Sequence, residues 1–154
     1  MPSFVYNKAA EEIATGTVNL LTDTIKTMLV TSTYSPARTD LVVDAGGAND
    51  PVDAEINVTG YTRGYGGAGR KSLASKTLTV DQSNNRAEFD AANLTWTALG
   101  SGATIAAMIV IKEGASNDTT SRLIAYLDVT DTATNGGDIT FTFDAEGIIQ
   151  FSTV

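Results

Sequence analysis

Two carboxylates, Glu88 and Asp90, are the clearest candidates for chemistry in this chain of 154 residues. Because they are two residues apart, a strand would place both side chains on one face of a sheet. Such a pair can hydrolyse a glycosidic bond without histidine, although a pair beside a hairpin is typical of a solvated sheet face. The chain contains no histidine and no cysteine. Since the commonest catalytic base and the thiol nucleophile are missing, we expect a protein that is not an enzyme.

A glycine-rich segment, residues 64–69 (GYGGAG), matches the pattern G-x-G-x-x-G, and Asp90 follows Gly69 after 21 residues, near the place of a ribose-binding acid. That fingerprint needs a preceding strand and a following helix, whose N-terminus holds the pyrophosphate. Here the following residues are typical of a strand and a hairpin. The continuation, residues 70–72 (RKS), misses the G-x-x-x-x-G-K-[ST] pattern by one residue. We therefore predict a glycine-rich loop that binds no nucleotide and no other cofactor.

Oxygen ligands for calcium occur in two polar segments, one with Asp81, Asn84 and Asn85 and the other with Asn117 and Asp118. Neither segment contains the D-x-[DN]-x-[DN]-G loop, so turns are favoured over a metal site. The absence of cysteine also excludes a disulfide framework and a thiolate metal centre.

Length and charge limit the number of domains and the kinds of partner that we expect. A chain of this length favours one domain, residues 1–154. The chain has 18 acidic and 10 basic residues, a net charge of −8 and a pI near 4.3. Because such a surface repels phosphates, we expect no nucleic-acid partner. No apolar run approaches the roughly 20 residues that span a bilayer, and no secretory leader is visible, so we expect no membrane partner.

The rest of the chain is dominated by short apolar segments separated by polar turns. This pattern predicts an all-β fold, specifically an antiparallel β-sandwich resembling a jelly roll, with about eight strands. The only tryptophan, Trp96, is expected to pack in the core between strands. The expected strands cover residues 23–33, 73–80, 86–89, 94–97, 104–112, 122–129, 138–143 and 148–153, and residues 81–85 are expected to connect a hairpin.

The N-terminal part, residues 1–22, is interpreted as an arm with a short helix. Residues 6–14 (YNKAAEEIA) predict one or two helical turns that end at Gly16. The aromatic residues Phe4 and Tyr6 precede the first strong core segment. They are either anchors that become buried against a partner or caps of the protein's own core, and the sequence favours neither.

The longest irregular stretch is residues 35–60, which contain two of the three prolines. It belongs to a long loop region that we place at residues 35–71. Residues 41–44 (LVVD) fit either a helical turn or a short strand. Loops of this length inside a compact domain are usually functional. We therefore regard this region as a candidate contact surface, with Leu41, Val42, Tyr61 and Tyr65 as candidate contacts in addition to Phe4 and Tyr6.

Six segments form an ordered pattern of turns and strand faces: 60–62 (GYT), 73–80 (LASKTLTV), 89–96 (FDAANLTW), 104–111 (TIAAMIVI), 123–128 (LIAYLD) and 143–150 (FDAEGIIQ). Taken in this order, the segments resemble small virion structural proteins of tailed bacteriophages. The resemblance covers residues 23–151 and is not a catalytic signature. It is interrupted at residues 44–51 and by the glycine-rich residues 64–71.

The resemblance implies a decoration (cement) protein that binds the outside of the major capsid protein shell and stabilises contacts between capsomers. It also implies a homo-oligomer, a dimer or a trimer, on the capsid exterior of a virion assembled in the host bacterial cytoplasm. No active-site residues follow from it. Two alternatives remain: a tail-associated module of the tube, baseplate or fibre, and a carbohydrate-binding module that uses Trp96, Tyr61 and Tyr65 as stacking platforms.

Overall fold

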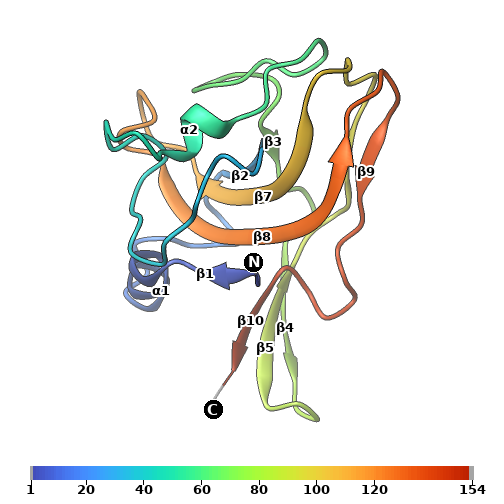
Figure 1. The fold of residues 1–154 in the computed structure, drawn as a ribbon. Coiled ribbons are helices and arrows are strands. Elements are labelled where there is room, and N and C mark those ends of the chain that lie inside the picture. Colours follow the sequence, from blue (N-terminus) through green and yellow to red (C-terminus); the bar gives the residue numbers. More distant parts are fainter. Residues whose placement is uncertain (1, 153–154) are drawn as a thin grey trace.

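The computed structural model describes residues 2–152 and shows an all-β fold built from antiparallel sheets (Figure 1). Two short helices accompany the strands. The elements are β1 (Phe4–Val5), α1 (Asn7–Ala14), β2 (Ile25–Val30), α2 (Pro51–Ala54), β3 (Lys71–Ser72), β4 (Thr77–Asp81), β5 (Arg86–Asp90), β6 (Leu94–Trp96), β7 (Thr104–Lys112), β8 (Arg122–Ala133), β9 (Ile139–Phe141) and β10 (Ile149–Ser152).

The largest sheet has five strands in the order β1-β8-β7-β2-β3. Its central strand β7 is buried along nearly its whole length, which explains why this segment reads as a continuous apolar run rather than an alternating one. Two register shifts between β7 and β8, at 105/107 and 110/111, interrupt the ladder. Because bulges bend a strand, they account for the strong curvature of this pair in Figure 1.

A second sheet, in the order β10-β5-β4, projects from the body as a narrow ribbon (Figure 1). Its β4–β5 hairpin turns over residues 82–85, as the sequence predicts. The carboxylate of Asp81 accepts hydrogen bonds from the backbone N–H groups of Ser83 and Asn84, and Asn85 adopts a positive φ of 52°. Both features are typical of Asx-stabilised turns. We call the β10-β5-β4 sheet the ribbon.

A third, two-stranded sheet pairs β6 with β9, and the threonine hydroxyls of Thr95 and Thr140 lie 2.8 Å apart across it. Trp96 is buried in the core and meets the ring of Phe141 edge-on. Its indole N–H donates to the carbonyl of Gly69 at 2.7 Å. The predicted core position of Trp96 is therefore confirmed.

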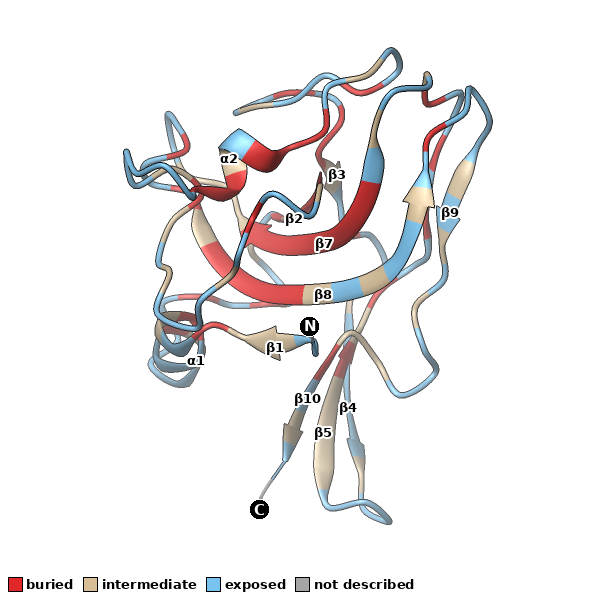
Figure 2. Cartoon of the chain, viewed as in Figure 1, coloured by how far each residue is buried: buried red, intermediate tan, exposed pale blue. Residues whose placement is uncertain are grey.

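One cluster of buried apolar side chains includes residues from Tyr6 to Ile149, and burial is concentrated on β7, β2 and the first half of β8 (Figure 2). Helix α1 covers one side, with Ala9 buried. It ends as predicted, because Gly16 takes a φ of +75° directly after the helix cap, a conformation that glycine adopts without strain.

All eight expected strands are present: β7 has the expected bounds, and the other seven differ at one or both ends. Residue 153, in the last expected strand, lies outside the described residues. The segment predicted to begin at Leu73 forms β4 only from Thr77, because Leu73 is buried in the core and its N–H bonds the carbonyl of Ile25. The two-residue strands β1 and β3 were not expected. Residues 41–44 contain only an isolated bridge between Val42 and Arg122, which is the short-strand alternative in its smallest form.

Candidate interaction surface

The carboxylates Glu88 and Asp90 lie on the polar face of the ribbon. Glu88 forms an ion pair with Arg86 at 2.8 Å, and the Arg86 guanidinium also approaches Asp81 and Glu146. Hydrogen bonding to Glu146 raises the pKa of Arg86 above its ordinary value. The Glu88 carboxylate is thus part of an ion-pair network.

The glycine-rich segment is a loop that leads into strand β3 and is not followed by a helix. The loop is closed on itself by a hydrogen bond from Gly67 N–H to Gly64 O. The N–H of Gly64, the first residue of the loop, donates to Glu55 Oε2 at 2.9 Å. This donor is therefore already bound to a carboxylate of the same chain. The predicted loop is confirmed, and the helix N-terminus that a pyrophosphate would need is not formed here.

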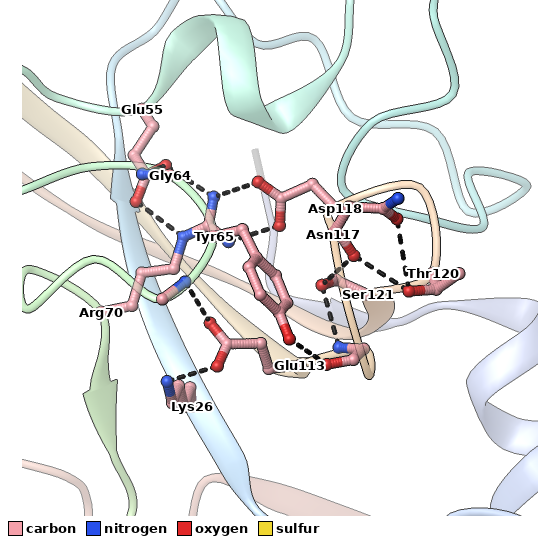
Figure 3. Close-up of polar contacts among 12 residues, drawn as sticks. Lys26, Glu55, Gly64, Tyr65, Arg70, Glu113, Asn117, Asp118, Thr120 and Ser121 are labelled. Atoms are coloured by element: carbon pink, nitrogen blue, oxygen red, sulfur yellow. Dashed lines mark hydrogen bonds and ion pairs between the residues drawn. The ribbon is translucent and has the colours of Figure 1, made fainter.

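A buried arginine, Arg70, follows the glycine loop directly (Figure 3). Its guanidinium donates twice to Glu55, from Nε to Oε1 at 2.9 Å and from Nη2 to Oε2 at 2.7 Å. It also donates to Asp118, from Nη1 to Oδ1 at 2.6 Å and from Nη2 to Oδ2 at 3.0 Å. Tyr61 completes the cluster by donating its hydroxyl to Glu55 Oε1 at 2.9 Å. We call these four residues the arginine cluster.

The electrostatics of the arginine cluster follow from its burial. Burial alone would lower the pKa of Arg70, but the hydrogen bonds to Glu55 and Asp118 outweigh it and raise the pKa above its ordinary value. Burial, followed by the charge of Glu55, raises the pKa of Tyr61 well above 10. Charged arginine and neutral tyrosine are therefore the stable forms. Removing the Arg70 guanidinium would leave two buried carboxylates without a counter-charge.

A second set of contacts lies beside the arginine cluster (Figure 3). Glu113 forms an ion pair with Lys26 and accepts the N–H of Gly66 at 3.2 Å. The hydroxyl of Tyr65 donates to the carbonyl of Gly114 at 2.9 Å. Together with the arginine cluster, these contacts tie residues 55–70 to residues 113–121. We call the surface made by residues 35–71 and 113–121 the loop face.

The candidate contacts in the loop face divide by burial. Leu41 is 50% exposed and Tyr65 is 40% exposed, so both present apolar surface to solvent. Val42 is buried only in part and lies at its bridge to Arg122. Tyr61, in contrast, is 3% exposed and belongs to the arginine cluster. It therefore offers no surface to a partner.

The candidate contacts of the N-terminal arm lie in strand β1 and at its end, against β8. Tyr6 is fully buried, and its hydroxyl lies 3.0 Å from that of Tyr34. The half-buried ring of Phe4 stacks on Tyr126. The guanidinium of Arg38 lies over the Phe4 ring, 4.7 Å from the ring centroid. This placement matches the alternative in which Phe4 and Tyr6 cap the protein's own core. Met1 lies outside the described residues.

The aromatic platform of the carbohydrate-binding alternative is not assembled. Of its three residues, Trp96 and Tyr61 are buried, and only Tyr65 presents part of its ring. An apolar groove of about 520 Å³ lies elsewhere, between β1 and β8 on one side and residues 141–150 on the other. Phe4, Phe141 and Phe143 contribute to its wall.

Two features of the structure were not predicted from the sequence. The arginine cluster joins residues that lie 15 and 48 positions apart, and no local spacing signals such a contact. The second feature is the apolar face of the ribbon, where Leu78 and Val80 are 49% and 67% exposed. Alternation of apolar and polar residues in 77–81 is a signal that could have indicated it.

Within residues 2–152, no group of three or more acidic side chains is arranged to hold a metal ion. In the same part of the chain, no helix has the length and apolar character needed to cross a membrane. The chain matches no protein-family model, no curated protein and no solved structure.

Proposed function

We propose that this protein is a non-enzymatic bacteriophage decoration protein that binds the outer surface of the major capsid protein shell through its loop face. The observation that carries the proposal is the arginine cluster, in which buried charges and hydrogen bonds hold Glu55, Arg70 and Asp118 in a fixed arrangement. The bacteriophage resemblance in the sequence supports the choice of partner.

A pre-shaped loop face suits binding to a large rigid surface. Ordering flexible loops on binding costs free energy, so a surface ordered in advance retains more of its contact energy. Tyrosine is among the residues that contribute most to protein interfaces, and Tyr65 is held by its hydroxyl while part of its ring stays exposed. Leu41 adds an exposed apolar side chain. These two residues are the proposed anchors.

The proposal includes the scaffold and the location. The curved five-stranded sheet would be one layer of a jelly-roll-like sandwich, and the β6–β9 pair with the base of the ribbon would contribute to the other. A net charge of −8 disfavours contact with packaged DNA, which suits the capsid exterior. The loop face then bridges neighbouring capsomers by burying apolar surface.

A binding assay on capsids tests the proposal. The probe is empty shells assembled from the major capsid protein encoded in the same genome, incubated with the full chain and pelleted. We expect Leu41→Lys and Tyr65→Ala each to weaken binding about tenfold, because truncated interface anchors typically cost more than 1 kcal/mol. The matched control is Thr130→Lys, which adds the same charge at an exposed position of β8.

Three outcomes of these binding experiments would count against the proposal or a part of it. Wild-type protein that stays in the supernatant contradicts the capsid function. Binding that is equal in all variants contradicts the loop face as the binding surface. Recovery of the native protein with purified tails rather than heads favours the tail-associated alternative.

A further inference from the structure

Strand β4 forms an open edge of the ribbon that carries no charge between Thr77 and Val80. Natural proteins usually protect such edges with charged residues, proline or a bulge, because an open edge pairs readily with another strand. Here β4 runs in regular register with β5, and Leu78 and Val80 are among the most exposed large apolar side chains. An edge of this kind is typical of an interface.

The backbone of β4 is oriented for pairing. In an antiparallel ladder, opposite residues either face each other or both face away. Phe89 accepts the N–H of Ile148 at 2.7 Å on the β10 side, so it faces away from β4. Leu78, which is opposite Phe89, therefore directs its N–H and C=O to the open edge, and so does Val80 two residues later. Thr79 between them faces β5.

The apolar face of the ribbon continues beyond β4. Leu78 lines a groove of about 310 Å³ together with Leu20, Leu21 and Phe151. Leu21 is itself 44% exposed. A strand added at the β4 edge would therefore place its inward apolar side chains next to an existing apolar surface, which would lose contact with water on pairing.

We propose that β4 pairs with β4 of a second copy of this chain, antiparallel and about a two-fold axis at Thr79. Leu78 then lies opposite Val80 of the second copy, and these two residues exchange backbone hydrogen bonds on both sides of the axis. The two Thr79 residues meet at the axis as a pair that is not hydrogen-bonded through the backbone. Cross-strand threonine pairs are favourable, and the chain already contains one at Thr95 and Thr140.

The charge pattern of the edge is compatible with a second copy in this orientation. Asp81 is the only charged residue of β4, and it would lie opposite the uncharged Thr77 of the second copy. No like charges lie directly opposite. Glu88 is one strand further in, so its two copies are separated by three strand spacings, about 14 Å. That distance exceeds the Debye length of about 8 Å at physiological salt.

The pairing does not depend on the capsid function. The loop face lies at the end of the molecule opposite the ribbon in Figure 1, so both surfaces can be used together. Two-fold pairing uses one edge in each copy and stops at a dimer. Pairing of β4 with the other ribbon edge, β10, would instead form open chains of molecules.

Light scattering coupled to size exclusion tests the dimer with the full chain. We expect a dimer whose dissociation constant rises on the order of tenfold or more in Val80→Lys, because two lysines are then buried or displaced at the interface. The matched control is Leu41→Lys, which places the same charge on the loop face and should leave the dimer intact. Leu41→Lys lowers capsid binding without affecting the dimer, so failures of the two proposals are distinguishable.

Disulfide trapping tests the register. Because the chain has no cysteine, Thr79→Cys introduces a single thiol at the axis, where Cα atoms of such pairs lie about 4.5 Å apart and a disulfide fits. We expect rapid covalent dimerisation under mild oxidation. Leu78→Cys is the control, since its two copies are separated by roughly 8–9 Å and cannot bridge.

A monomer at high micromolar concentration contradicts the proposal. Equal cross-linking of both cysteine variants contradicts the two-fold register, and large assemblies indicate pairing of β4 with β10 instead. A dimer that survives Val80→Lys places the interface elsewhere on the molecule.

Discussion

Arg70 is the residue on which the shape of the loop face depends. It is 3% exposed and contacts two carboxylates from distant parts of the chain. We expect Arg70→Met to lower the free energy of unfolding by about 3–5 kcal/mol, because Glu55 and Asp118 would remain buried without a counter-charge. Denaturant unfolding followed by circular dichroism measures this loss. Arg70→Lys should restore little, since one ammonium cannot replace the guanidinium fork.

Arg86→Met is the matched control for Arg70→Met. Arg86 also pairs with several carboxylates, but it lies half-buried on the polar face of the ribbon, and its partner Glu146 is exposed. Water and salt screen such pairs, so we expect a clearly smaller shift of the denaturation midpoint. Equal shifts of the denaturation midpoint in the two variants would contradict the expectation that burial makes the ion pairs of Arg70 contribute more to stability than those of Arg86.

At the scale of elements, close packing explains why the loop at residues 64–69 is rich in glycine. A Cβ added at Gly69 would lie 2.5 Å from the ring of Tyr61, and one at Gly67 would lie 2.2 Å from the carbonyl of Thr62. We therefore expect Gly69→Ala to destabilise the fold strongly, by roughly 1–3 kcal/mol as in overpacked cores. The shift of the thermal midpoint measures the effect.

Gly102→Ala provides the comparison for Gly69→Ala. Gly102 has a φ of +121° but nothing within 4 Å of an added Cβ, so that variant reports backbone strain without a clash. A greater loss in Gly69→Ala than in Gly102→Ala supports packing against Tyr61. A Gly69→Ala variant as stable as the wild type would contradict the close approach.

At the scale of the whole molecule, buried tyrosines couple stability to alkaline pH. Burial, above all, raises the pKa of Tyr6, Tyr34 and Tyr61 above the ordinary value of 10. As the pH rises past 10, the unfolded chain releases phenolic protons that the folded chain retains. The stabilisation is thus complete below pH 10 and is lost progressively above it.

Phenolate absorbance and circular dichroism recorded on the same samples check this pH dependence. We expect the phenolate signal of the buried tyrosines to appear together with loss of the sheet signal, in one transition. Ionisation of all tyrosines near pH 10 with an intact sheet signal would contradict the burial of these hydroxyls.

Much of the fold could be predicted because the signals are local. Continuous apolar character marks β7, alternation marks β2, and Gly16 marks the end of α1. The two-residue strands β1 and β3 could not be predicted, since their pairing depends on the neighbouring strand rather than on their own residues. Of the candidate contacts, Leu41 and Tyr65 are exposed as the loop interpretation requires, while Tyr6 and Tyr61 are buried. The residues on either side of a tyrosine do not show whether its side chain is buried or exposed.

The sequence by itself determined the all-β class, the order of the main strands and the absence of histidine and cysteine chemistry, because these follow from composition and short-range periodicity. Only the tertiary structure decided what the chemically suggestive residues do. Arg70 meets Glu55 and Asp118 across long loops, and the glycines let the backbone pack around that contact. Whether a charged side chain reacts, pairs or faces water depends on neighbours brought by the fold, and those neighbours are distant in the chain.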